Sequence, residues 1–186
     1  GHEFIQRAAM ERTGADGLYI NPVTGPKKTN DFRAEHVLAS YQLILEHGAY
    51  PPGRALLGAF NTYPRYAGPR EAVFTALCRK NMGCSYFVIG RDHTGVGDFY
   101  PADANRRYFE SLGVLGITPI YFDAVGYDER MEAYKEAPTS DGLMSISGTV
   151  VRDLLRAGER LPGWFMREEI QDLLRIRVEA GDKLFH

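Results

Sequence analysis

The sequence of 186 residues predicts an α/β fold, built on a parallel sheet with helices on both faces. The first observation is that short apolar runs alternate along the chain with longer segments whose apolar residues recur every three or four positions. The second is that polar, glycine-containing motifs follow the apolar runs directly. In a parallel sheet these positions are the carboxyl ends of the strands, where ligands bind.

In the first third of the chain, helices are predicted over 3–13 and 33–47, each with its apolar residues on one face. The apolar run 18–20 lies between a glycine and an Asn-Pro pair, which is typical of a short strand. Residues 55–60 form an apolar run that ends at Asn61, and they predict a buried strand.

The alternation continues in the middle of the chain. A helix is predicted over 69–81, since proline at its start favours a first helical turn. Residues 85–89 predict a buried strand, and 101–112 predict a further helix. Residues 117–122 predict a fourth strand, which Pro119 interrupts early. Crossovers between such parallel strands are expected to be right-handed.

The last part of the chain contains little strand material. Helices are predicted over 149–158 and 167–178, after a seam between Gly142 and Ser147. This pattern predicts a catalytic-type domain of residues 1–143 and a small, mostly helical C-terminal subdomain of residues 144–186.

The composition limits the functions that the chain can serve. A net charge of −2 and a pI of about 6.2 disfavour general nucleic-acid binding. The apolar runs are too short to span a membrane, and no signal peptide is visible. The two cysteines, Cys78 and Cys84, are too few for a cysteine-rich metal site, and they indicate reduced thiols in a cytoplasmic protein.

The segment Gly90-Arg91-Asp92-His93-Thr94 follows a predicted buried strand and leads to two more glycines. Glycine permits close approach of the backbone to a ligand, and successive loop N–H groups can bind an anion. The planar guanidinium of Arg91 suits sulfate or phosphate oxygens, and His93 can donate to a phosphate. Asp92 is better suited to orienting the loop or accepting from a ribose. An ordinary turn with a surface Arg–Asp pair is the alternative.

This loop resembles the signature of ATP sulfurylases, and other segments match that family in the same order. They are Asn21-Pro22 through Gly25, Lys28, Asp31, Tyr66 to Ala72, Arg79-Lys80-Asn81, Gly83-Cys84, Ser147-Gly148-Thr149, Arg152 to Leu155 and Pro162 to Phe165. The resemblance implies a Rossmann-like sheet of the nucleotidyltransferase type. It also implies that ATP and sulfate react directly to give adenylyl sulfate and pyrophosphate, with Mg²⁺ accompanying the ATP.

Site residues follow from the same resemblance. His2 corresponds to the second histidine of a His-x-x-His segment that stabilises the reacting phosphate. The resemblance implies catalytic roles for His2, Arg91 and His93, nucleotide binding by Gly90, Arg91, Asp92, His93, Phe122 and Asp123, sulfate binding by Arg91 and Thr94, and bracing of the cleft by Lys28 and Asp31. From the residues alone, Lys28 and Asp31 fit a solvated charged loop equally well.

The chain also departs from the family pattern. The family's first strand, its Gln-x-Arg-Asn segment and its first histidine would lie before Gly1, so we expect an N-terminally truncated catalytic region whose activity on its own is open. Residues 127–138 hold neither cysteine nor histidine, so no zinc is expected.

Two other functions stay open, namely a non-catalytic nucleotide- or anion-binding lobe and an adenylyltransferase with another acceptor. The resemblance further implies a homo-oligomer and the possibility of fusion to an adenylylsulfate kinase.

Overall fold

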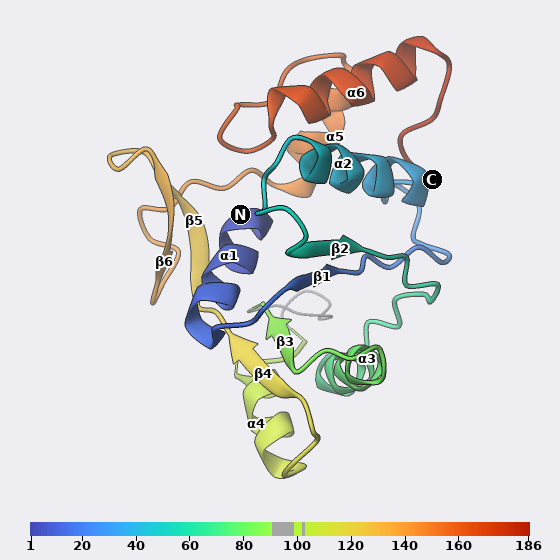
Figure 1. Ribbon diagram of the computed structural model, residues 1–186. Coiled ribbons are helices and arrows are strands. Elements are labelled where there is room, and N and C mark those ends of the chain that lie inside the picture. Colours follow the sequence, from blue (N-terminus) through green and yellow to red (C-terminus); the bar gives the residue numbers. More distant parts are fainter. Residues whose placement is uncertain (91–98, 102) are drawn as a thin grey trace. The chain divides into compact units, whose positions relative to one another are not determined.

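The computed structural model describes residues 1–90, 99–101 and 103–186, and within them it confirms the α/β class (Figure 1). The helices are α1 (His2–Thr13), α2 (Ala34–Glu46), α3 (Pro69–Asn81), α4 (Ala104–Ser111), α5 (Gly148–Arg156) and α6 (Glu168–Glu179). The strands are β1 (Leu18–Ile20), β2 (Ala55–Leu57), β3 (Tyr86–Ile89), β4 (Thr118–Tyr121), β5 (Ala124–Asp128) and β6 (Ala133–Ala137).

The chain divides into two compact units. Unit 1 comprises residues 1–14, 64–126 and 134–143, and unit 2 comprises residues 15–63, 127–133 and 144–186. Residues 144–186 therefore share a unit with a long earlier segment. The predicted division into 1–143 and 144–186 stays a prediction.

Unit 1 is built on a parallel pair of strands. Strand β3 pairs with β4 in a register that sets Tyr86 opposite Thr118 and Ile89 opposite Tyr121. Helices α3 and α4 pack against this pair. The buried core that they share consists of Ala72, Val73, Ala76, Ile89, Phe109 and Ile117. The carboxyl end of β3 is anchored in this core, since Ile89 is only 1% exposed.

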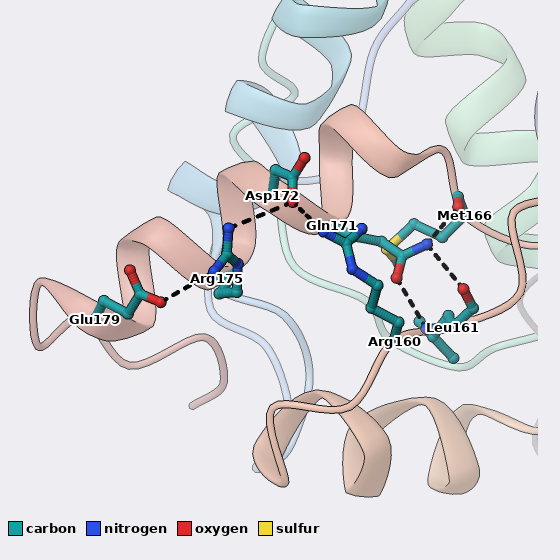
Figure 2. A network of polar contacts seen from close by, with 7 residues as sticks. All are labelled: Arg160, Leu161, Met166, Gln171, Asp172, Arg175 and Glu179. Carbon is teal, nitrogen blue, oxygen red and sulfur yellow. Dashed lines mark hydrogen bonds and ion pairs between the residues drawn. The ribbon is translucent and has the colours of Figure 1, made fainter.

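Unit 2 is built on the parallel pair β1–β2, with Leu18 opposite Ala55 and Ile20 opposite Leu57. Its larger core brings together the strands, α2, α5, α6 and the C-terminal residues. It contains Ile20, Ile44, Ala49, Tyr50, Val151, Leu155, Leu161, Ile170, Leu174 and Leu184. The amide of Gln171 bonds to Leu161 and Met166 beside this core, and a surface network of ion pairs runs along α6 (Figure 2).

The structure shortens two predicted elements for identifiable reasons. The strand predicted over 55–60 ends at Leu57, although the amides of Gly58 and Phe60 still donate to Ile20 and Pro22. The proline on the facing segment has no N–H to offer, so the regular ladder stops there. The helix predicted from residue 101 begins at Ala104, whose N–H donates to the carbonyl of Pro101.

The strand pair β5–β6 was not predicted from the sequence. Its first strand, Ala124–Asp128, alternates buried and half-buried residues but contains alanine and glycine, which are weak strand formers. The second strand, Ala133–Ala137, carries adjacent Lys and Glu. The turn between them is held by Asp128, whose carboxylate accepts from the N–H groups of Arg130 and Met131 at 2.9 and 3.2 Å.

The predicted parallel pairing of strands is therefore confirmed, but the described strands form three two-stranded sheets, β1–β2, β3–β4 and β5–β6. In the described ranges, no helix combines the length and apolar character that a membrane crossing requires.

Candidate functional site

The carboxyl ends of β3 and β4 bring two predicted site segments to the same edge. The N–H of Phe122 donates to the carbonyl of Ile89 at 3.4 Å, which extends the parallel ladder by one bond. Gly90 directly follows Ile89, so Gly90 and the pair Phe122–Asp123 leave their strands side by side. This is the edge at which parallel sheets bind ligands.

The most informative motif of the sequence falls largely outside the described residues. Arg91, Asp92, His93 and Thr94 all lie in the range 91–98, which the structure does not describe. The residue before this range, Gly90, is half-buried, and a side chain at this position would meet open space. Its φ angle lies outside the left-handed region, so the backbone at Gly90 itself does not require glycine.

The residues after this range are anchored to another predicted family segment. A Cβ atom at Gly68 would lie 2.4 Å from the ring of Tyr100, so only glycine allows Tyr100 to pack there. Gly68 also has a φ of 55°, in the left-handed region. Gly68, in the Tyr66 to Ala72 segment, thus leaves the space in which Tyr100 packs, two residues after the range 91–98.

The preceding loop is held by a buried carboxylate. Glu71 is 6% exposed and accepts hydrogen bonds from the N–H groups of Arg65 and Ala67, at 2.8 and 3.0 Å. Glu71 is the third residue of α3, where a negative charge is favoured by the exposed N–H groups of the helix start. Tyr66 lies between the two donors with a φ of 54°, a conformation that costs a non-glycine residue about 1–2 kcal/mol. Glu71 therefore has a structural role at this turn.

The end of β4 is held by two charged residues that were not predicted as site residues. The Phe122 ring is buried, and the guanidinium of Arg12 lies over it at 4.3 Å from the ring centre. Arg12 forms an ion pair with Glu136 of β6. The other oxygen of Glu136 accepts from the N–H of Asp123 at 2.7 Å.

The charge of Glu136 is stabilised in this arrangement. Partial burial works to raise the pKa of its carboxyl group, but the hydrogen bonds from Arg12 and Asp123, together with the Arg12 charge, lower it below its ordinary value. Glu136 is thus an ionised acceptor at neutral pH. The N–H groups of both Phe122 and Asp123 are engaged within the protein, by Ile89 and Glu136 respectively.

His2 lies at the start of α1, in unit 1. The residue is exposed, yet the surrounding protein removes part of the imidazole's hydration, which lowers its pKa. His2 and Arg12 lie near opposite ends of this helix, about 15 Å apart along its axis. Arg12 is the residue of α1 whose guanidinium lies over the Phe122 ring.

Lys28 and Asp31 lie in unit 2, in the turn before α2. The N–H of Asp31 donates to the carbonyl of Lys28 at 3.1 Å. The C-terminal residue His186 brackets this turn, since it accepts from the N–H of Asn30 and donates to the carbonyl of Asp31, both at 3.1 Å. Lys28 is exposed and Asp31 is half-buried. Their role in a cleft stays a prediction.

Sequence reasoning missed Arg12 and Glu136, for which no local motif exists. Arg12 and Glu136 are 124 residues apart in sequence, and Glu136 belongs to a strand that was itself not predicted. Over the described ranges, no group of three or more His, Cys, Asp or Glu side chains is placed to hold a metal ion. The expected absence of zinc stays a prediction.

Comparison with known proteins places these residues in context. The model of the family described as ATP-sulfurylase matches residues 1–176. The sulfate adenylyltransferase of Symbiobacterium thermophilum is 43% identical over 187 residues, a match that covers 97% of this chain and 47% of that protein. The sulfate adenylyltransferase of Cenarchaeum symbiosum is 40% identical over 177 residues, with 93% of this chain and 46% of that protein covered.

The chain spans about half the length of the curated relatives that it matches. Among solved structures, a chain of the hexameric APS kinase from Thiobacillus denitrificans is similar, with a TM-score of 0.66 and 20% identity. That match covers 96% of this chain and 33% of the other, and at this identity it concerns the fold alone.

Proposed function

Because this chain belongs to the ATP-sulfurylase family, we propose that the complete protein containing it is a sulfate adenylyltransferase. The enzyme joins sulfate to the AMP part of ATP and releases pyrophosphate. The similarity to curated sulfate adenylyltransferases along nearly the whole chain is the observation that supports this reaction.

The reaction requires positioning and charge stabilisation rather than a general base. A sulfate oxygen, already deprotonated at neutral pH, attacks the α-phosphorus of ATP. A new sulfate–phosphorus bond forms while the bond to the bridging oxygen of the β-phosphate breaks, and pyrophosphate leaves with that electron pair. Since two anions must approach each other in line, the protein's main task is to hold them and to stabilise negative charge.

The residues proposed for this task lie on the loop after β3. Arg91 binds sulfate and a phosphate of ATP through its planar guanidinium. His93 donates to a phosphate oxygen, and Gly90 and Asp92 contact the nucleotide. The N–H of Thr94 binds sulfate, with its hydroxyl beside the anion. The loop between Gly90 and Gly95 offers no serine or cysteine nucleophile, which agrees with direct attack by sulfate.

The strand edge supports this assignment. Gly90 and the Phe122–Asp123 segment lie side by side at the carboxyl ends of β3 and β4, linked by the Ile89–Phe122 hydrogen bond. We assign the nucleotide to this edge. His2, Lys28 and Asp31 complete the proposal, with His2 stabilising the reacting phosphate and the other two bracing the cleft.

The remaining parts of the proposal concern cofactors and partners. Mg²⁺ is proposed as part of the MgATP substrate. A homo-oligomer is proposed as well, and the similar solved structure is described as hexameric. A cytoplasmic location and fusion to an adenylylsulfate kinase remain predictions from the sequence.

The test is to supply the complete protein and residues 1–186 separately with adenylyl sulfate, pyrophosphate and Mg²⁺, and to measure the ATP formed. We expect ATP from the complete protein. ATP from residues 1–186 as well would show that these residues suffice for the reaction. Binding of ATP without turnover by the complete protein would instead support a non-catalytic nucleotide-binding function and would overturn the proposal.

A second arm tests the acceptor. The complete protein is supplied with ATP and either sulfate or no acceptor, and pyrophosphate release is followed. Release that depends on sulfate supports the proposal. Release that requires a different acceptor would make the protein an adenylyltransferase of another specificity.

A further inference from the structure

We infer that Glu136, held by Arg12, is a positioning residue for the nucleotide, because it occupies the N–H of Asp123 and so leaves this strand end with hydrogen-bond acceptors for the nucleoside. The inference rests on the proposed function, which assigns the nucleotide to the edge formed by Gly90 and Phe122–Asp123. Arg12, Asp123 and Glu136 all belong to unit 1, and the contacts among them come from one compact body.

The backbone donors at this strand end are already used within the protein. The N–H of Phe122 donates to Ile89 at 3.4 Å, and the N–H of Asp123 donates to Glu136 at 2.7 Å. The polar groups that this segment can turn towards a ligand are its backbone carbonyls and the exposed Asp123 carboxylate. All of these accept hydrogen bonds, and none suits a phosphate.

The carboxylate of Glu136 is held in place from two sides. Glu136 accepts from Asp123 through one oxygen and pairs with Arg12 through the other. Arg12 also packs its guanidinium against the buried ring of Phe122, the residue before Asp123. Ring, guanidinium, carboxylate and peptide N–H therefore form one connected cluster. Glu136 is less exposed than Arg12, with 20% of its side-chain surface accessible against 44%, so its orientation is restricted.

The acceptors of this edge suit the nucleoside part of the ligand. An edge that offers acceptors binds donor groups, and a nucleoside triphosphate has two kinds of donor away from its phosphates, the amino group of the base and the hydroxyls of the ribose. If Glu136 is removed, the N–H of Asp123 becomes a free donor and the same edge can accommodate an acceptor group. The cluster would thus set both affinity for ATP and discrimination against analogues that lack a donor.

The experiment uses the complete protein and measures initial rates of pyrophosphate release from ATP and sulfate. For Glu136→Ala we expect KM for ATP to rise about ten-fold with kcat changed less than two-fold, since the Asp123 segment loses the hydrogen bond to a charged group that holds its acceptors in place for the nucleoside. Glu136→Gln keeps an oxygen for the Asp123 N–H, so we expect it to recover most of this loss. Glu129→Ala, which removes an exposed carboxylate from the β5–β6 turn, is the matched control.

Analogues provide the readout that a merely structural role would not change. The ratio of kcat/KM for ATP to that for inosine triphosphate tests the base amino group, and the ratios for 2′-deoxy-ATP and 3′-deoxy-ATP test the hydroxyls. In Glu136→Ala, one of these ratios should fall about ten-fold, and the ratio that falls identifies the donor. Ratios that all stay at the wild-type values would overturn the inference.

Two further outcomes keep the inference separate from the proposed function. Failure of the wild-type protein to release pyrophosphate from ATP and sulfate counts against the proposed function. An active wild type with unchanged KM in Glu136→Ala counts against the positioning role alone. If Glu136→Ala fails to fold, Arg12→Gln removes the ion pair and the guanidinium over the Phe122 ring while keeping Glu136, and it should still raise KM for ATP about three-fold. A KM unchanged in Arg12→Gln would then overturn the role of the pair.

Discussion

Units 1 and 2 each attach a loop to a helix through one buried polar side chain, but they use different chemistry. In unit 1 the carboxylate of Glu71 accepts from Arg65 and Ala67. In unit 2 the amide of Gln171 accepts from the N–H of Leu161 at 2.8 Å and donates to the carbonyls of Leu161 and Met166, at 2.9 and 2.8 Å (Figure 2). A carboxylate can only accept, whereas an amide does both.

The difference has a functional consequence. The carboxylate of Glu71 turns the N–H groups of its loop inwards, so these donors are not available to an anion. The carboxylate of Glu136 likewise accepts from the N–H of Asp123, so this donor is not available to an anion either. Anion binding in unit 1 is thereby left to groups other than these amides, which agrees with the proposal for the Gly90 loop. The neutral amide of Gln171 suits a position beside the apolar core of unit 2, because it needs no counter-charge.

The largest effect is expected where charge acts on the reaction itself. Arg91→Ala in the complete protein should lower the rate of ATP formation about 100-fold or more, because a charged hydrogen-bond donor to sulfate and phosphate is lost. The far-UV circular dichroism spectrum should not change. Arg107→Ala, on the exposed side of α4, is the control. Near-normal turnover in Arg91→Ala would remove Arg91 from the mechanism.

The next effect tests the core of unit 2. Leu174 is 2% exposed, and Leu174→Ala should reduce the free energy of unfolding by about 3 kcal/mol through lost burial and a cavity. The single tryptophan, Trp164, stacks on Tyr127 at 4.9 Å between ring centres, so its fluorescence reports on unit 2 during urea unfolding. Ile176→Ala, at an exposed position of the same helix, should cost less than about 1 kcal/mol. Equal losses in the two variants would contradict the described core.

A slightly smaller effect tests the carboxylate of unit 1. Glu71→Ala should reduce the free energy of unfolding by about 2–3 kcal/mol, since two amide donors lose a charged acceptor. The loss is measured by circular dichroism during urea unfolding, with Glu110→Ala, at an exposed position of α4, as the control. A Glu71→Ala variant as stable as the wild type would show that the loop before α3 does not depend on this carboxylate.

The smallest effects separate buried from exposed polar contacts on one helix. Gln171→Ala should reduce the free energy of unfolding by about 2 kcal/mol, because it leaves buried backbone groups of Leu161 without partners. Asp172→Ala, which breaks the half-exposed ion pairs with Arg160 and Arg175, should cost about 0.5 kcal/mol. Both are measured by Trp164 fluorescence in urea. If Asp172→Ala lowered the free energy of unfolding more than Gln171→Ala, the buried amide would not be the stronger of the two contacts.

Local patterns predicted most of the regular structure. The strand 18–20 and the helix 69–81 were predicted with the bounds that the structure gives. The pair Asn21-Pro22 ends the strand, and Pro69 begins the helix. The pair β5–β6 was missed, since alternation in a short segment of small and charged residues gives little signal.

By itself, the sequence determined the α/β class, the parallel pairing and the motifs that identify the family, because these depend on periodicity and on residues close together along the chain. Only the tertiary structure decided how distant residues combine. It joined Arg12 to Glu136 and Asp123, and it set the C-terminal residues beside the turn of Lys28 and Asp31. The physical reason is that such contacts form when the chain folds back on itself, and no local spacing encodes which side chains will then meet.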